Sequence, residues 1–383
     1  MKWQKASTRK WAFIGAGIIV ILALTYLEIN ALVVEDTKES IKIGFIGAMS
    51  GGSAKYGAYE AVKLAQDEIN AKGGIGGKRL DIVYEDGKCD SKEAATAANK
   101  LINIDKVKII LGGHCTPESL VIAPLAEKNK VIILASITSN PKLTTAGDYI
   151  FRTTPISTVQ SPIIADLLYN KLKKRNLAII YEQTDYAKPI AEKLKQEFEN
   201  KGGLVFVFES YSPGTIDFRT IILKAKDSNA DSLFISAQNP DSALNIMKQI
   251  KEQGINIQLA GNEGASGQVI IDKIPDLYEG FIAAMPAYDE KNKETEKFIK
   301  AYQEKYGQKP PFGINTAESY DAVYIVSNCL EKFGENIDKI KQCLYGIKDF
   351  DGASGIVTID DNGDAIKEYN ARIVKNGSFV LLS

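Results

Sequence analysis

One alternation of apolar and amphipathic segments occurs twice along the chain, and it limits the fold more than any other feature. Residues 41–47 are apolar on both faces, as expected for a buried parallel strand. The helix predicted after them ends at a Lys-Gly-Gly sequence, residues 72–74, where glycine tolerates the left-handed conformation of a helix end. Later in the chain a strand at 177–181 and a helix at 190–198 repeat this order, and Lys-Gly-Gly again follows.

Both copies continue with further strands and helices. The first copy adds strands at 80–84, 107–111 and 131–134 with helices at 92–102 and 120–127, and the second adds strands at 204–208, 232–236 and 256–259 with helices at 218–225 and 243–253. Alternation of this kind builds a parallel sheet with helices on both faces. The sequence therefore predicts an α/β fold made of two similar, doubly wound parallel-sheet lobes.

Beyond Pro286 the alternation gives way to a different pattern. Helices are expected at 293–306 and 317–332, followed by a shorter helix that ends near residue 347. Two hairpin turns are expected at Asn362-Gly363 and Asn376-Gly377, because this dipeptide favours the tight turns of hairpins.

The length and charge of the chain agree with a two-domain globular protein. At 383 residues it is too long for one ordinary core and about right for two domains with an appendage. Lysine and arginine number 47 and aspartate and glutamate 48, which gives a net charge of -1. No overall basic field therefore indicates a nucleic-acid partner.

The first 38 residues differ from the rest of the chain. Basic residues precede an uncharged apolar run of about 17 residues from Trp11 to Leu27, near the lower limit for a membrane span. Basic residues on the N-terminal side predict that this side stays in the cytosol and that the rest is exported. We expect residues 1–38 to form a cytosolic tip, a single-pass transmembrane helix and a linker. A signal peptide cleaved after Asn30-Ala31 is the alternative.

All four cysteines lie in the exported part: Cys89, Cys115, Cys329 and Cys343. An even number of cysteines in an oxidising compartment predicts two disulfides, and four buried thiols are the alternative. No pair has the C-x-x-C spacing of a zinc or thiol–disulfide site, so no metal is expected there.

The motifs of enzymes that bind phosphate or use a serine nucleophile are absent from the sequence. It contains neither G-x-x-x-x-G-K-[ST] nor G-x-S-x-G. The single histidine, His114, has no second histidine for metal binding or proton relay, and we interpret it as a packed loop residue. We therefore expect no enzymatic activity and no cofactor.

The loops that follow the predicted strands are the best candidates for a binding site. In open parallel sheets, ligands bind beyond the carboxyl ends of the strands. The loops selected by this rule supply hydroxyls, aromatic rings, an amide and one acid, at Tyr56, Thr116, residues 136–140, residues 183–186, Gln238 and Glu263.

These groups suit a zwitterion. Thr116 lies at the start of a predicted helix, where its hydroxyl and free backbone N–H groups can receive a carboxylate. Ser139, from the next loop of the same lobe, adds a second hydroxyl, and Glu263 from the other lobe can pair with an ammonium. The alternatives are a helix cap for Thr116 and a solvated loop acid for Glu263.

Several stretches give the chain a family resemblance from about Glu39 to the C-terminus. They are residues 47–51 (Gly-Ala-Met-Ser-Gly), 70–75 (Asn-Ala-Lys-Gly-Gly-Ile), 84–90 (Tyr-Glu-Asp running to Cys-Asp), Cys115 with its following hydroxyl, 140–144 (Asn-Pro-Lys-Leu-Thr) and 263–264 (Glu-Gly). With these stretches in this order, the chain resembles the leucine/isoleucine/valine-binding family of periplasmic binding proteins.

The resemblance implies two lobes that are joined by three hinge strands and close around a ligand. The family's ligand contacts fall here on Tyr56, Thr116, Thr138, Ser139, Tyr186 and Glu263. By this analogy Thr116, Ser139 and the backbone at Thr138 hold an α-carboxylate, Glu263 holds an α-ammonium, and the two tyrosines form the walls of the side-chain pocket. Gln238 stands where the branched-chain binders carry an aromatic residue, which puts a strictly aliphatic pocket in doubt.

The resemblance also implies the lobe boundaries and one of the two cysteine pairs. Lobe I is expected over 39–156 plus 287–352, and lobe II over 157–286 plus 353–383. Cys89 and Cys115 match the family's disulfide near the site, whereas Cys329 and Cys343 have no clear counterpart. The expected pairs are Cys89–Cys115 and Cys329–Cys343.

The function implied is that of a monomeric extracytoplasmic receptor, tethered to the cell membrane by its N-terminal helix. It would capture a branched-chain or related amino acid and deliver it to the permease of an ABC importer. A sensor module that reports an amino acid or small amide to a membrane partner is the alternative.

Overall fold

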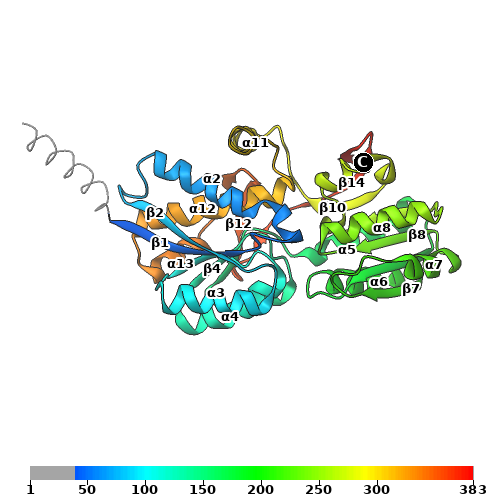
Figure 1. Cartoon of the computed structure of the whole chain (residues 1–383), viewed down its shortest axis with the longest axis horizontal. Coiled ribbons are helices and arrows are strands. Elements are labelled where there is room, and N and C mark those ends of the chain that lie inside the picture. Colours follow the sequence, from blue (N-terminus) through cyan, green and yellow to red (C-terminus); the bar gives the residue numbers. More distant parts are fainter. Residues whose placement is uncertain (1–38, 383) are drawn as a thin grey trace, which may run out of the picture.

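The computed structural model describes residues 39–382 and contains two α/β lobes that lie side by side (Figure 1). The first lobe is built on a five-stranded parallel sheet in the order β2-β1-β3-β4-β5. Its strands are β1 (Ser40–Gly47), β2 (Arg79–Asp86), β3 (Ile109–Gly112), β4 (Ile132–Ala135) and β5 (Ile150–Arg152).

Helices cover both faces of this sheet. One face packs against α2 (Ala58–Ala71), α12 (Gly313–Phe333) and α13 (Ile337–Tyr345), and the other against α3 (Ser91–Asn103) and α4 (Thr116–Asn129). Helix α11 (Lys293–Tyr306) packs on α2 from outside. Each fully buried isoleucine or leucine of these layers stabilises the fold by about 1.5–3 kcal/mol.

The second lobe repeats the architecture with two extra strands. Its seven-stranded sheet has the order β15-β14-β10-β9-β8-β6-β7, and only β14 runs antiparallel to its neighbours, β10 and β15. The strands are β6 (Asn176–Glu182), β7 (Leu204–Tyr211), β8 (Ser232–Ser236), β9 (Gln258–Gly261), β10 (Ile282–Pro286), β14 (Tyr369–Lys375) and β15 (Ser378–Leu381). Helices α5 (Gln160–Asp166) and α6 (Ala187–Asn200) cover one face, and α7 (Arg219–Asp227), α8 (Pro240–Glu252), α9 (Gln268–Ile271) and α10 (Pro275–Tyr278) cover the other.

The repeated Lys-Gly-Gly sequence ends the corresponding helix in each lobe in the same way. The Gly74 N–H donates to the carbonyl of Ile69 at 3.0 Å, and the Gly203 N–H donates to that of Phe198 at 3.1 Å. Gly74 has φ +80°, and a Cβ there would lie 1.9 Å from the Lys78 carbonyl oxygen, so only glycine fits. The repeat seen in the sequence is therefore a structural repeat.

The chain passes between the lobes three times: after β5, after β10, and again before β14. A small three-stranded sheet precedes the last passage and consists of β11 (Phe350–Gly352), β12 (Gly355–Ile359) and β13 (Ala365–Ile366). Val357 and Ile359 of this sheet belong to the core of the first lobe, and Asp364 forms a buried ion pair with Arg152 at 2.6 Å. The structure thus places residues 353–366 with lobe I, although the sequence boundary at 352/353 assigned them to lobe II.

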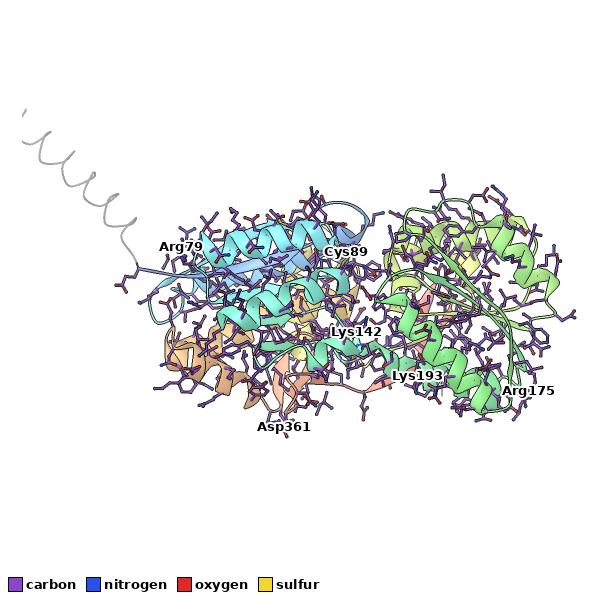
Figure 2. All side chains as sticks on the ribbon, turned by 90° about the horizontal axis from the view of Figure 1, so that it is seen from below. Arg79, Cys89, Lys142, Arg175, Lys193 and Asp361 are labelled. Carbon is purple, nitrogen blue, oxygen red and sulfur yellow. A yellow bond between two sulfur atoms is a disulfide. The ribbon has the colours of Figure 1, made fainter. Side chains whose placement is uncertain are left out.

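The carboxyl ends of the first sheet face the second lobe. In Figure 2, Arg79 at the start of β2 lies at the far end of the first lobe, whereas Cys89, just beyond the other end of β2, lies beside the second lobe. The loops that the sequence analysis selected are thus brought to the boundary between the lobes.

The expected transmembrane helix at Trp11–Leu27 falls outside the described residues. Within residues 39–382, no helix is both long and apolar enough to cross a membrane.

Both expected disulfides are confirmed. Cys89 is bonded to Cys115, at a sequence separation of 26, and Cys329 to Cys343, at a separation of 14. Cys115 and Cys329 are buried, and Cys329 lies in the core of lobe I.

We expect the two disulfides to differ in their effect on ligand binding. Replacing Cys329 and Cys343 together by alanine should lower the free energy of unfolding by about 3 kcal/mol, by the loop-entropy estimate, and leave ligand affinity unchanged. Replacing Cys89 and Cys115 should cost similar stability and also weaken binding, because this disulfide lies at the boundary between the lobes. Urea unfolding measures the stability of the two double variants, and calorimetry measures their ligand affinity. If the variant without Cys89 and Cys115 bound ligand as tightly as wild type, the second expectation would be contradicted.

Candidate functional site

A small cavity lies between the lobes at the carboxyl ends of their strands. Its volume is about 30 Å³, and it is lined by Tyr56, His114, Cys115, Thr116, Ile137, Tyr186, Gln238, Glu263 and Asn315. Five of these are residues that the sequence analysis selected as ligand contacts. A space of this size holds about one water molecule, so the lobes are closed upon each other here.

Side chains from the two lobes bond to each other across this boundary. The Tyr56 hydroxyl donates to the Gln238 carbonyl oxygen at 3.0 Å, and the Gln238 amide donates to Cys89 Sγ at 2.9 Å. Lys55 pairs with Asp241 at the edge of the site. Opening the lobes would break these contacts.

Thr116 is the first residue of α4, and its hydroxyl is buried without a hydrogen-bond partner in the described part of the chain. It does not cap the helix, because Cys115 occupies the N-cap position and the Glu118 carboxylate completes a capping box by accepting the Cys115 N–H at 2.8 Å. Glu118 also accepts the Cys89 N–H at 2.9 Å. The helix-cap interpretation of Thr116 is therefore wrong, and its hydroxyl is available to a ligand.

Thr138 and Ser139 follow β4, next to the loop that holds Thr116. The Thr138 hydroxyl donates to the Gly113 carbonyl oxygen at 2.9 Å and accepts from Ser119 at 2.7 Å. These bonds tie the two loops together, so the Thr138 side chain holds the loops in place. The Ser139 hydroxyl is buried and has no partner among residues 39–382, but Ser139 does not line the cavity.

Glu263 begins a short 3-10 helix just beyond β9 and is only 5% exposed, so it is not a solvated loop acid. Its carboxylate accepts the Tyr369 hydroxyl at 3.1 Å. Burial raises the pKa of Glu263 to about 7, and the charge of Glu318 adds to this rise. A cation beside Glu263 would relieve that cost.

Beneath Glu263 lies a buried ion pair between Glu318 of α12 and Lys367, 3.0 Å apart with side chains 0% and 3% exposed. Burial also raises the pKa of Glu318 to about 7, despite the opposing charge of Lys367. The Lys367 ammonium also donates to the Ser354 hydroxyl at 2.7 Å. Lys367 is thus already paired with Glu318 and hydrogen-bonded to Ser354.

Three cavity or site residues were missed or undervalued by the sequence analysis. His114 is buried, as expected for a packed residue, but it also lines the cavity. Asn315 lies beside Glu263 because α12 begins at Gly313, four residues before the expected start. Tyr369 comes from β14, near the end of the chain. No local pattern marks Asn315 or Tyr369, since both reach the site only through the tertiary fold.

A larger groove of about 680 Å³ runs past Phe312, Tyr288 and Arg372 on another side of the lobe boundary. It passes the end of β10 and the loop after β9, but none of the residues that the sequence analysis selected as ligand contacts lines it. We therefore place the site in the smaller cavity, which five of those residues line and where the Thr116 hydroxyl and Gln238 Oε1 are buried without a partner in the described part of the chain. Among residues 39–382, no group of three or more histidine, cysteine or acidic side chains could hold a metal ion.

Comparisons with known proteins agree with this geometry. The family described as "Periplasmic binding protein" matches residues 40–378. The "Leucine-, isoleucine-, valine-, threonine-, and alanine-binding protein" of Pseudomonas aeruginosa is 28% identical over 330 residues, 85% of this chain and 87% of that protein. The "Leu/Ile/Val-binding protein" of Escherichia coli is 28% identical over 332 residues, 85% of this chain and 88% of that protein.

Solved structures give the same result. A leucine binding protein from Thermotoga maritima superposes with a TM-score of 0.81 at 28% identity, covering 90% of this chain and 98% of that one. A branched-chain amino acid binding protein from Streptococcus pneumoniae, in complex with isoleucine, has a TM-score of 0.81 at 27% identity, covering 89% and 98%. A solute-binding protein from Rhodopseudomonas palustris, in complex with 3,4-dihydroxybenzoic acid, has a TM-score of 0.78 at 25% identity, covering 89% and 95%. The chain therefore belongs to the periplasmic binding protein family, with the type I fold, and is a solute-binding protein related to those of branched-chain amino acid ABC transporters rather than an enzyme.

Proposed function

We propose that the protein is an extracytoplasmic receptor that captures an amino acid between its lobes and delivers it to the permease of an ABC importer. The observation that carries this proposal is the buried Glu263 carboxylate at the cavity, opposite the free hydroxyl of Thr116. An acid from one lobe and a hydroxyl from the other match the two charged ends of an amino acid. A ligand that joins them favours the closed arrangement of the lobes.

The carboxylate end of the ligand would bind in lobe I. Thr116 opens the long helix α4, whose N-terminus carries partial positive charge, and its hydroxyl is free to donate. Ser139 lies in the neighbouring loop, which the Thr138 and Ser119 hydroxyls tie to the loop before α4. The hydroxyls of Thr116 and Ser139 thus lie on segments that are hydrogen-bonded to each other.

The ammonium end would bind at Glu263 of lobe II. Glu263 and Glu318 are both buried, and Lys367 is the cation paired with Glu318. A ligand ammonium would balance the second carboxylate in a dry site, where charge-assisted hydrogen bonds are strong. An aromatic carboxylic acid such as the ligand of the R. palustris relative has no ammonium and would leave Glu263 uncompensated, so Glu263 favours an amino acid.

At the N-terminus we propose that the Trp11–Leu27 segment stays attached as a membrane anchor, with the lobes outside the cell membrane.

The Glu263→Gln variant tests the ammonium contact. It removes the charge and keeps the shape, so the affinity for the amino acid should fall by about 1.5–3 kcal/mol, roughly 10- to 150-fold. Isothermal titration calorimetry against all common amino acids measures this. The exposed Glu252→Gln on α8 is the matched control and should bind like wild type. Unchanged affinity of Glu263→Gln would rule out the ammonium contact and favour a ligand without an amine.

The same carboxyl should make stability depend on pH in the ligand-free protein. Burial raises the pKa of Glu263 from 4.5 to about 7, so between these values the native state binds more protons than the unfolded state. The free energy of unfolding should therefore fall as pH rises from about 4.5 to 7, with roughly 1–3 kcal/mol due to Glu263. Glu263→Gln should flatten this slope in part, since Glu318 titrates in the same window. Urea unfolding at a series of pH values measures the slope, and an equally steep slope in the variant would contradict the assignment.

The anchor proposal predicts that the mature protein retains residues 11–27 and stays in the membrane fraction after alkaline extraction. N-terminal sequencing of the mature protein provides the second measurement. A sequence that begins near Leu32 would show that the segment is a cleaved signal.

A further inference from the structure

The part of the cavity beside Tyr56 contains a hydrogen-bond donor of fixed position, the imidazole of His114. The Ala48 N–H donates to His114 Nδ1 at 3.2 Å, so Nδ1 is the acceptor and the ring proton is on Nε2. Burial lowers the pKa of His114 to about 4, which keeps the ring neutral. His114 is 2% exposed, and its Nε2 has no partner in the described range 39–382. An unpaired N–H donor therefore lines the cavity.

The same cavity contains an acceptor of fixed position, the side-chain carbonyl of Gln238. The Gln238 amide nitrogen donates to Cys89 Sγ at 2.9 Å. A disulfide sulfur can only accept a hydrogen bond, so this contact fixes which end of the amide is the nitrogen. Gln238 Oε1 is left buried and without a partner among the described side chains and backbone.

The Gln238 backbone is held from both lobes, and the bond from its amide to Cys89 Sγ holds the side chain. Its N–H donates to the buried Glu182 carboxylate at 2.8 Å, and its carbonyl accepts the Tyr56 hydroxyl at 3.0 Å. The donor and the acceptor thus come from opposite lobes and line one cavity, together with the apolar faces of Tyr56, Ile137 and Tyr186.

An aliphatic side chain in this cavity would leave the His114 donor and the Gln238 acceptor unpaired, and a buried polar group without a partner is costly. A hydroxyl or primary amide satisfies both, because each group donates and accepts. Given the amino-acid receptor function proposed above, we propose that the ligand is an amino acid whose side chain bears a hydroxyl or amide, and that His114 and Gln238 determine this specificity.

Two isosteric ligand pairs test the proposal on the purified full-length protein. Threonine and valine differ by a hydroxyl in place of a methyl group, and asparagine and leucine differ by an amide in place of an isobutyl end. Calorimetry should show the polar member of at least one pair binding about ten- to a hundredfold more tightly.

Single variants then show which residues set the preference. His114→Phe and Gln238→Leu each remove one polar partner and keep the size, so each should bring the ratio of affinities within the pair close to one. Thr116→Val is the matched control: it should weaken both members alike and leave their ratio unchanged. Thermal melting without ligand checks that each variant folds. If His114→Phe does not fold, the affinity ratios of the Gln238→Leu variant and of wild type test the proposal.

Three outcomes would overturn the proposal. Wild type could bind valine and leucine at least as tightly as their polar partners, which would leave the amino-acid receptor function intact. His114→Phe could weaken both members of a pair equally, which would place His114 at the ligand's carboxylate. Binding of benzoate but of no amino acid would instead refute the proposed amino-acid receptor function itself.

Discussion

The buried carboxylate of Glu263, which has no cation of its own among residues 39–382, links closure of the lobes to the charge of the proposed ligand. Glu318 and Lys367 form an almost fully buried pair, and Lys367 lies in the last passage between the lobes, just before β14. Glu263 reaches the same region from lobe II, and the charge of Glu318 raises its pKa further. Because a buried carboxylate without a counter-ion is unfavourable, closure over Glu263 requires either a proton or a cation. A ligand ammonium can provide that cation.

The opposite wall of the site depends on Glu118. This buried carboxylate accepts the N–H groups of Cys89 and Cys115, the two residues that the disulfide joins. The loops after β2 and β3 are thus held by a covalent bond and by a shared acceptor. Gln238 of lobe II in turn donates to Cys89, so the position of the disulfide also sets the side-chain wall of the cavity. In lobe I, the disulfide and Glu118 therefore hold the loop after β3, which lines the cavity.

Much of this arrangement could be predicted from the sequence, because strand and helix periodicity and the loops that follow each strand are local properties. The parallel sheets, both disulfides and the cavity positions of Tyr56, Thr116 and Glu263 follow from such patterns or from the family resemblance. Asn315 could not be predicted, since the expected helix began after it. Nor could the role of Tyr369 or the packing of β12 on lobe I, which depend on how distant segments meet.

In the proposed site, His114 combines a structural role with a ligand-facing one. The sequence offered no second histidine, so packing was the natural interpretation, and the ring is indeed buried against Tyr56. Its bond to the Ala48 N–H uses one ring nitrogen and thereby fixes the proton on the other. Among relatives of this fold, one binds isoleucine and another an aromatic acid, so the sheets alone do not select a ligand. In the proposed site, selection of the ligand depends on the few buried polar atoms that have no hydrogen-bond partner within the described protein.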